Sequence, residues 1–522
     1  MVSCAEALIK GLTDLDVKTI FGMPGRWVLP LYEALASYNI NHITVKHEQA
    51  AAHAADGYAR VSGRIGVCLG TAGPGATNMV TGVATAFRDY SPLIVLTGQP
   101  SLKLEGREVI EEIDLVSIFR PVTKLSMLLR DGGSGYKALM EAYKVAMTPP
   151  MGPVHLSIPG DVQELPSTFG EPISLKVDVS PDEEDILMVT ELISKSAKPL
   201  LMAGEGVYWS NSINELIKVA EILNIPVVTS LKGRGVIPED HYLSLGFTGI
   251  RGKGEANKAL EECDLLIALG CRLSDLTIGS LKPNQKIIYV DVCPRPIALR
   301  SNPIYIRSDA KTFLKSLLQK LPVRNTKPWV SVGKTFSEPS HAIQKIIWKI
   351  SKLIPENSIY VLDIGQHTIW AITTLMVKRP RSLILPGNFS TMGFALPAAM
   401  GVKIAKPNET VVALMGDGGL LSCLGELTTI KQYEIPILII VFNNRGYGLI
   451  AQIQEYLYGR KYSVDFPSLD FVKIAESVGI RGLKVKNEND LDFMPTIDEP
   501  LLLEVLVDPS ERVPLKKLSY EE

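Results

Sequence analysis

Short apolar runs of strand length recur along the whole chain, and most of them end in a glycine or a polar residue before a helical pattern begins. The clearest runs lie at residues 64–70, 93–97, 154–158, 199–203, 226–229, 265–269, 286–290, 358–362, 411–415 and 437–442. Continuous apolar runs that alternate with helices are typical of strands in parallel sheets whose two faces are both covered. The pattern predicts an α/β protein built from doubly wound parallel sheets.

Two polar segments that contain proline, residues 167–185 and 322–339, interrupt this pattern in the way that linkers do. The chain of 522 residues is also too long for a single core. Division at the linkers predicts three domains, residues 1–166, 186–322 and 340–522. The first and third domains share a strand, glycine turn, helix and strand, over residues 73–98 and 416–443. This similarity indicates a duplicated unit, although parallel α/β domains in general have the same pattern.

Composition narrows the classes of partner. The chain has 54 basic and 56 acidic residues, so its charge gives no reason to expect nucleic acid or an anionic membrane as a partner. No apolar stretch approaches the roughly 20 residues that a membrane helix needs. Residues 1–17 have the pattern of an amphipathic helix with acidic residues inside it, and not of a secretory leader, so we expect a cytoplasmic protein. The six cysteines lack metal-ligand spacing, which favours buried reduced thiols over metal ligands or disulfides.

The strongest chemical signal is the sequence Gly-Asp-Gly-Gly at 416–419, which directly follows an apolar strand. Asn444 follows the next strand, so both polar segments are expected at the carboxyl edge of neighbouring parallel strands, where ligands bind. Glycines let the backbone approach a diphosphate, and the N–H groups of the following helix point at the same anion. The oxygens of Asp417 and Asn444 suit a magnesium ion that also binds phosphate. The glycine turn alone would be a weak signal, and its pairing with the asparagine makes it specific.

Glu48 is the second signal. It stands where a short strand meets an alanine-rich helix, residues 48–60, and the alanines indicate that this helix is closely packed. Glu48 is therefore either a partly buried functional acid or an acid that favours the positive end of the helix dipole.

Several motifs lie in a fixed order along nearly the whole chain. They are FGMPG at 21–25, HEQAAAHAADGYAR at 47–60, GTAGPGATN at 70–78, TGQP at 97–100, GPVHLSIPGDVQ at 152–163, GQH at 365–367, STMGFALPAAMG at 390–401, GDGG at 416–419 and NN at 443–444. In these motifs the chain resembles the thiamine-diphosphate enzymes of the acetolactate synthase, benzoylformate decarboxylase and pyruvate decarboxylase group. The resemblance implies a pyrimidine-binding domain, a central Rossmann-like domain and a diphosphate-binding domain.

The resemblance also implies roles for individual residues. Glu48 would hydrogen-bond to the pyrimidine ring of the cofactor and help to remove the proton from its reactive carbon, and Met392 would hold the cofactor bent. The backbone carbonyl of Ser390 would accept from the pyrimidine amino group, and that of Gly446 would complete the metal site beside Asp417 and Asn444. The remaining cofactor-binding residues implied are Pro24, Gly25, Gly365, Gln366, His367, Gly416, Gly418, Gly419 and Tyr447. Taken alone, Met392 could be an ordinary core residue, and His367 could be a capping histidine.

The first domain and the GQH motif resemble acetolactate synthases most, but three positions depart from the motifs of the biosynthetic enzymes. Leu276 stands where an arginine is expected to bind the second substrate, Ile110 replaces a phenylalanine, and Ile453 replaces a tryptophan. The marks of the decarboxylases are missing too, because the chain has no adjacent pair of histidines and has Leu69 where benzoylformate decarboxylase has a histidine. The three departures weigh against a standard synthase of branched-chain amino acids.

The leading interpretation is a carboligase that decarboxylates pyruvate or a similar small 2-oxo acid, with thiamine diphosphate and Mg²⁺ as cofactors. We expect a homodimer or homotetramer, because in this family Glu48 and the metal site come from different subunits. The alternatives are a decarboxylase that releases an aldehyde, an oxalyl-coenzyme A type decarboxylase, and a cofactor-binding regulatory subunit. FAD is doubtful, because the central domain has no complete GxGxxG, and a structural role and a nucleotide-binding role remain equally open for it.

Overall fold

The computed structural model describes residues 2–175, 179–279, 281–282, 285–293, 302–321, 327–330 and 339–514. Its chain divides into two compact units. The first unit contains Met1–Leu175, Ile354–Thr368 and Ile384–Arg512, and the second contains Lys176–Leu353, Ile369–Leu383 and Val513–Glu522. Residues 176–178, 322–326 and 331–338 of the two expected linkers lie outside the described residues.

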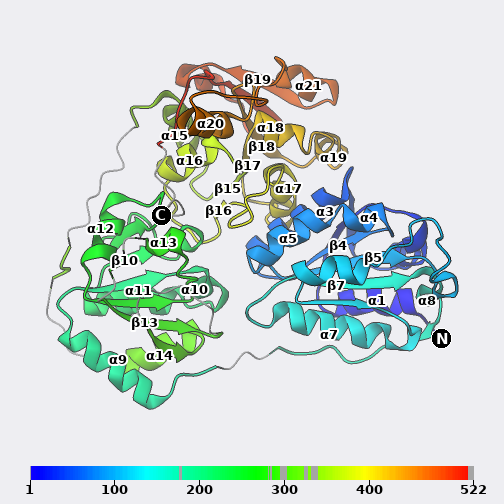
Figure 1. Ribbon diagram of the computed structural model, residues 1–522, viewed down its shortest axis with the longest axis horizontal. Coiled ribbons are helices and arrows are strands. Elements are labelled where there is room, and N and C mark those ends of the chain that lie inside the picture. Colours follow the sequence, from blue (N-terminus) through cyan, green and yellow to red (C-terminus); the bar gives the residue numbers. More distant parts are fainter. Residues whose placement is uncertain are drawn as a thin grey trace. The chain divides into compact units, whose positions relative to one another are not determined.

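The first sheet belongs to the first unit and has six parallel strands in the order β3-β2-β4-β5-β7-β6. Figure 1 labels β4, β5 and β7 of this sheet. The strands are β2 (Thr19–Gly22), β3 (Asn41–Thr44), β4 (Gly66–Gly70), β5 (Leu93–Gln99), β6 (Leu125–Leu128) and β7 (Val154–Pro159). The main helices are α1 (Cys4–Asp14), α2 (Leu29–Ala36), α3 (Glu48–Ser62), α5 (Val80–Arg88) and α7 (Gly135–Met147). Val67 and Leu69 of β4 pack in the core with α1, α2 and α7, whereas Cys68 packs in the core with α3 and α5. Both faces are buried, which explains the continuous apolar runs.

The expected amphipathic helix at the start of the chain is α1. Ser3 begins it with a capping box: the Ser3 hydroxyl accepts from the N–H of Glu6 at 3.1 Å, and the Glu6 carboxylate accepts from the N–H of Ser3 at 2.6 Å.

The third sheet also belongs to the first unit, apart from Leu383, and has the order β16-β15-β17-β18-β20-β19. Its strands are β15 (Ile359–Leu362), β16 (Leu383–Ile384), β17 (Val411–Gly416), β18 (Ile437–Asn443), β19 (Arg481–Val485) and β20 (Leu501–Leu506). Its helices include α16 (Gln366–Thr374), α17 (Ala395–Ala405), α18 (Asp417–Leu421), α19 (Glu426–Gln432), α20 (Gly448–Tyr458) and α21 (Phe471–Ser477). Numbered within each sheet, the strands of the first and third sheets have the same order, 2-1-3-4-6-5. This shared topology agrees with the duplicated unit that the sequence suggests.

Helices α3 and α17 join the two sheets of the first unit through a close crossing. A Cβ atom on Gly57 would lie 2.2 Å from the carbonyl oxygen of Ala398, and one on Gly401 would lie 1.9 Å from that of Ala54. The contacts are reciprocal, because each glycine lies three residues after the alanine that the other glycine meets. Only glycine lets the two backbones approach so closely.

The central sheet belongs to the second unit and has the order β11-β10-β9-β12-β13-β14. Its strands are β9 (Pro199–Ala203), β10 (Val227–Thr229), β11 (Ser244–Phe247), β12 (Leu265–Leu269), β13 (Lys286–Asp291) and β14 (Ile304–Arg307). Its helices include α9 (Glu183–Lys195), α11 (Ile213–Leu223), α12 (Gly254–Glu262) and α14 (Ala310–Gln319), and α15 (Ala342–Leu353) belongs to the same unit. Numbered within the sheet, this order is 3-2-1-4-5-6, that of the Rossmann fold. The predicted class, three doubly wound parallel-sheet domains, is confirmed.

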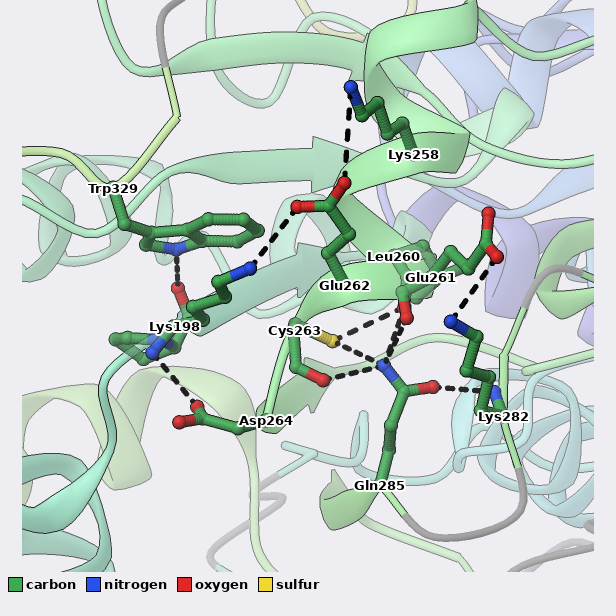
Figure 2. A network of polar contacts seen from close by, with 11 residues as sticks. Lys198, Lys258, Leu260, Glu261, Glu262, Cys263, Asp264, Lys282, Gln285 and Trp329 are labelled. Carbon is green, nitrogen blue, oxygen red and sulfur yellow. Dashed lines mark hydrogen bonds and ion pairs between the residues drawn. The ribbon is translucent and has the colours of Figure 1, made fainter.

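A network of polar contacts holds the start of strands β9, β12 and β13 (Figure 2). The Gln285 side-chain amide donates to the carbonyls of Leu260 at 2.8 Å and Cys263 at 2.6 Å, where α12 ends, and the Leu260 carbonyl also accepts from the Cys263 thiol at 3.3 Å. The Asp264 carboxylate accepts from the backbone N–H of Lys198 at 3.0 Å, and the Trp329 indole donates to the Pro199 carbonyl at 2.7 Å. This network stabilises the edge of the central sheet opposite to the carboxyl ends of its strands.

Among the described residues, no helix is both long and apolar enough to cross a membrane. Cys4, Cys68 and Cys263 are buried thiols outside any disulfide, as expected, and burial raises the pKa of each to about 12.

Candidate active site

Asp417 lies at the carboxyl edge of the third sheet, where β17 ends and α18 begins, and its side chain is buried. Its Oδ1 accepts from the N–H of Gly418 at 2.8 Å, and its Oδ2 accepts from the N–H of Gly446 at 3.0 Å. Burial raises the pKa of this carboxyl group to about 6, although the backbone hydrogen bonds act to lower it. The glycine turn and the segment after β18 thus meet at one carboxylate.

The segment after β18 is a tight turn that carries Asn444 and Gly446. Asn443 anchors it, because its amide donates to Glu504 at 2.7 Å and its oxygen accepts from the N–H of Arg445 at 3.2 Å. Arg445 has a φ of 60°, and a Cβ on Gly446 would lie 2.4 Å from the carbonyl oxygen of Val464. The turn therefore needs both a left-handed residue and a glycine.

Gln366 and His367 begin α16 beside this turn. The Asn444 amide donates to Gln366 Oε1 at 3.2 Å, and the Gln366 amide donates to Gln452 Oε1 at 3.0 Å. His367 is buried and stacks on Phe442 with ring centroids 6.0 Å apart, and burial lowers its pKa to about 3. Its Nε2 has no hydrogen-bond partner among the described residues. A neutral, buried imidazole with an unused nitrogen is suited to a ligand and is costly without one.

Met392 and Tyr447 converge on Gly418. A Cβ on Gly418 would lie 2.8 Å from the Tyr447 ring and 3.2 Å from the Met392 methyl carbon. Ser390, two residues before Met392, has a φ of 57°, and its N–H donates to the Pro386 carbonyl at 3.3 Å. Met392 thus lies against the glycine turn and is not an isolated core residue.

Glu48 is the first residue of α3 and is 4% exposed. The Asn78 amide donates to its Oε2 at 2.9 Å, and its Oε1 would lie 3.3 Å from a Cβ on Gly75. The two residues before it, Lys46 and His47, donate their N–H groups to Glu426 Oε1 at 2.9 and 3.0 Å. Glu48 therefore lies at a helix start and is also buried. A favourable interaction with the helix dipole does not require this burial.

Pro24 and Gly25 follow β2 at the carboxyl edge of the first sheet. A Cβ on Gly25 would lie 2.5 Å from the Thr71 side chain, so Gly25 packs against the GTAGPG loop. Gly365, with a φ of 156°, lies close to the His367 ring. Gly416 directly precedes Asp417, and Gly419 lies two residues after it.

These residues fit thiamine diphosphate and magnesium chemically. A carboxylate oxygen, an amide oxygen and a backbone carbonyl are hard ligands of the kind that Mg²⁺ prefers, and the Asn444 nitrogen is already engaged by Gln366, which leaves its oxygen for a metal. The glycine turn at the start of α18 and the unused nitrogen of His367 suit an anion. Among the described residues no group of three or more His, Cys, Asp or Glu side chains could hold a metal ion.

Sequence reasoning missed three polar residues that support this site. Asp363 accepts from the N–H groups of Gly393 at 3.2 Å and Ala395 at 2.9 Å, Glu426 holds the residues before Glu48, and Asn78 contacts Glu48 itself. Asp363 carried a usable signal, since it is an acid directly after an apolar strand, like Asp417.

Comparison with known families matches all three domains in order. The description "Thiamine pyrophosphate enzyme, N-terminal TPP binding domain" matches residues 2–118, the central domain of the same enzymes matches 186–317, and their "C-terminal TPP binding domain" matches 363–504. The chain belongs to the thiamine pyrophosphate enzymes. Thiamine pyrophosphate is the older name of thiamine diphosphate. The predicted family and the predicted enzyme class are therefore confirmed.

Within this family the chain is similar to acetolactate synthase large subunits. It is 39% identical to "Probable acetolactate synthase large subunit" of Methanocaldococcus jannaschii, over 98% of this chain and 93% of that protein. It is 37% identical to "Acetolactate synthase large subunit" of Lactococcus lactis, over 98% and 93%, and 36% identical to "Acetolactate synthase isozyme 3 large subunit" of Escherichia coli, over 94% and 91%. The carboligase interpretation is supported, and the decarboxylase and regulatory-subunit alternatives are not favoured.

Proposed function

We propose that this chain is an acetolactate synthase-like catalytic subunit that uses thiamine diphosphate and Mg²⁺ to decarboxylate pyruvate, or a similar small 2-oxo acid, and to join the product to a second 2-oxo acid. Similarity to acetolactate synthase large subunits over nearly the whole chain is the observation that carries this proposal. The cluster around Asp417 supports it, because it combines hard metal ligands with a glycine turn at a helix start. We propose domains at 1–166, 186–322 and 340–522, and a cytoplasmic location.

In this proposal the third domain holds the diphosphate and the metal. Asp417, Asn444 and the Gly446 carbonyl bind Mg²⁺, and the turn at Gly416, Gly418 and Gly419 faces the diphosphate with its backbone. Gln366 orients Asn444, and His367 donates from its unused nitrogen as a neutral imidazole. When bound, thiamine diphosphate supplies a nucleophilic carbon and an electron sink for the departing carbon dioxide.

Glu48 has the proposed catalytic role. Its carboxylate is buried at the start of α3, where it would hydrogen-bond to the pyrimidine ring and move a proton there. Pro24 and Gly25 line the same edge of the sheet. Met392 and Tyr447 pack the cofactor against Gly418, and the Ser390 carbonyl accepts from the pyrimidine amino group.

We propose that the enzyme is a homodimer or larger homo-oligomer in which Glu48 of one subunit serves the metal site of another. Mixing two inactive variants, Glu48→Gln and Asp417→Ala, tests this arrangement. If sites are shared between subunits, half of the sites in a mixed dimer are intact, and random mixing restores about a quarter of wild-type activity. If each site lies within one chain, every site carries a lesion and the mixture stays inactive.

Product analysis tests the function itself. Purified protein with thiamine diphosphate and Mg²⁺ is given pyruvate alone, and then pyruvate with 2-oxobutanoate. Because Leu276 and Ile453 stand where relatives of this type are expected to hold and size the acceptor, we expect acetolactate with poor preference for 2-oxobutanoate. Loss of a charge-assisted hydrogen bond worth about 1.5–3 kcal/mol corresponds to roughly tenfold to a hundredfold weaker acceptor binding. Free aldehyde as the sole product would contradict the proposed carboligation.

The same assay addresses flavin and the acceptor site. We expect full activity without added FAD, and activity that disappears on removal of a tightly bound flavin would contradict this.

Arg26 is a candidate to bind the acceptor carboxylate. It is exposed beside Gly25, its guanidinium carbon lies 5.0 Å from the centroid of the Trp27 ring, and it has no acidic partner among the described residues. Arg26→Ala is therefore expected to raise the KM of the acceptor more than it lowers kcat. The side chain of Leu276 lies outside the described residues.

A further inference from the structure

Asp363 is a fully buried carboxylate at the end of β15, in the third sheet. Its own backbone N–H donates to the Leu414 carbonyl at 2.8 Å, which fixes it beside β17, and its carbonyl accepts from the Thr368 hydroxyl at 2.6 Å. Neither the metal site nor the proton transfer at Glu48 uses it. Such a group is costly to bury unless its oxygens are well bonded.

Both carboxylate oxygens of Asp363 accept from the chain directly after Met392. Oδ1 accepts from the N–H of Gly393 at 3.2 Å, and Oδ2 accepts from the N–H of Ala395 at 2.9 Å. Ala395 begins α17, and the residue before it, Phe394, provides no side-chain cap. Asp363 therefore caps α17 from a strand about 30 residues away, where its charge also favours the positive end of the helix.

The same carboxylate lies against the glycine turn. A Cβ on Gly419 would stand 3.1 Å from Cγ and Oδ1 of Asp363. The same Oδ1 of Asp363 also accepts from the N–H of Ile364 at 2.9 Å. Asp363 thus connects three segments: the turn that leads to Gln366, the segment after Met392, and the start of α18.

We propose that Asp363 is a positioning residue that sets where Met392 stands against the cofactor, by holding the backbone on its C-terminal side. The inference rests on the proposed function, since it assumes that Met392 packs against thiamine diphosphate. Gly393 has a φ of 77°, so the chain turns sharply between Met392 and α17, and the two hydrogen bonds fix that turn. Without them Met392 is free to move away from Gly418, and the cofactor loses the wedge that bends it.

An amide cannot replace this carboxylate. Asparagine has a single acceptor oxygen, so in Asp363→Asn the side-chain NH₂ faces the N–H of either Gly393 or Ala395. The variant keeps the size of the side chain and removes one of two acceptors. Asp470→Asn is the control for loss of a capping carboxylate, because Asp470 caps α21 of the same sheet by accepting from the N–H of Lys473 at 3.1 Å. It also accepts from the Lys484 ammonium group at 2.8 Å, and neither partner belongs to the proposed site.

Hydrogen exchange tests the proposal in two ways, neither of which needs a substrate. The first follows the amides of Gly393 and Ala395 in the protein without cofactor. The second follows exchange of the reactive-carbon proton of bound thiamine diphosphate into deuterium oxide, by acid quench and proton NMR. We expect Asp363→Asn to exchange the two amides at least tenfold faster, and the cofactor proton at least tenfold more slowly, with cofactor affinity within a fewfold of wild type. Asp470→Asn is expected to change neither rate.

Cofactor-proton exchange within twofold of wild type in Asp363→Asn would overturn the proposal, because a cap with a purely structural role leaves that rate unchanged. If the variant does not fold, amide exchange in the wild-type protein tests the contact instead. Exchange of the Gly393 and Ala395 amides as fast as that of exposed amides would show that Asp363 does not hold them in solution, and protection of these amides would support the proposal. Failure of the proposed function would appear separately, as wild-type holoenzyme that makes no product from pyruvate.

Discussion

Replacement of Gly401 by alanine is expected to destabilise the first unit, although alanine favours a helix over glycine by about 1 kcal/mol. The added Cβ would stand 1.9 Å from the Ala54 carbonyl oxygen and 2.7 Å from its carbon, both of them backbone atoms. Ordinary contact needs roughly 3.4 Å or more, so α3 and α17 must move apart by on the order of 1 Å or more, which also weakens their remaining contacts. Overpacking of this kind costs about 1–3 kcal/mol, and a clash with backbone belongs at the upper end.

Thermal unfolding of the cofactor-free protein measures this effect. A loss of about 3 kcal/mol lowers the midpoint of a unit of this size by roughly 4–5 °C. Gly57→Ala makes the reciprocal clash, 2.2 Å from the Ala398 carbonyl oxygen, and is expected to behave alike. Gly254→Ala is the control, because this glycine begins α12, is exposed and has no atom within 4 Å of its Cβ position. A Gly401→Ala protein as stable as wild type would refute the reasoning from the crossing.

Three further predictions concern the site. Glu48→Gln is expected to keep the fold and cofactor affinity but lose most turnover, and steady-state rates within a fewfold of wild type would rule out its proposed role as proton carrier. Asp417→Ala is expected to weaken Mg²⁺ and thiamine diphosphate together in calorimetric titrations, with Asn444→Ala milder because it removes an uncharged ligand; unchanged cofactor affinity in excess Mg²⁺ would argue against a metal site. Burial raises the pKa of Asp363 to about 6, and its titratable neighbour Cys423 stays a neutral thiol because its own pKa is raised well above its usual value. An acid whose pKa is higher in the folded state stabilises the protein most at low pH. As the pH rises from about 4 to 6, the free energy of unfolding of wild type is therefore expected to fall by up to about 3 kcal/mol relative to that of Asp363→Asn, as denaturant unfolding would show.

The sequence predicted most of the strands that are buried on both faces, because a continuous apolar run is a strong signal, but it missed β2, whose four residues are all buried. The strands β9 and β12 match the expected ranges residue for residue. It missed edge strands such as β3, with the sequence NHIT, and β19, with RGLKV, in which polar residues break up the run. It also missed β20, LLLEVL, whose buried Glu504 interrupts an otherwise apolar segment and whose leucines suit a helix equally well.

The placement of the candidate site residues was predictable where they follow strands in sequence, as Asp417 and Asn444 do. The structure places these two at neighbouring strand ends and joins their turns through Gly446. The partners of the supporting carboxylates were not predictable, because the pairing of Asp363 with the start of α17, and of Glu426 with the residues before Glu48, depends on contacts between segments distant in sequence. Periodicity and spacing in the sequence indicate the helix or strand to which a residue belongs, but they do not predict such contacts between distant segments.

The shared topology relates the two proposed halves of the cofactor site. In both sheets a key residue lies at or just before the start of the helix after the second strand. Glu48 is the first residue of α3 and lies nine residues before Gly57, and Met392 lies three residues before α17 and nine residues before Gly401. The two helices therefore cross at equivalent positions, and the reciprocal glycine contacts behave like an isologous interface within one chain.

Each helix start in this pair is held by a buried carboxylate of the third domain. Glu426 accepts the two N–H groups before Glu48, and Asp363 accepts two N–H groups after Met392. Because one crossing fixes both helices, a shift there moves Glu48 and Met392 together. A substitution at the crossing is thus expected to impair turnover as well as stability, even though the atoms nearest to a Cβ on either glycine belong to Ala398, Ala54 and Tyr58 and not to the proposed cofactor-binding residues.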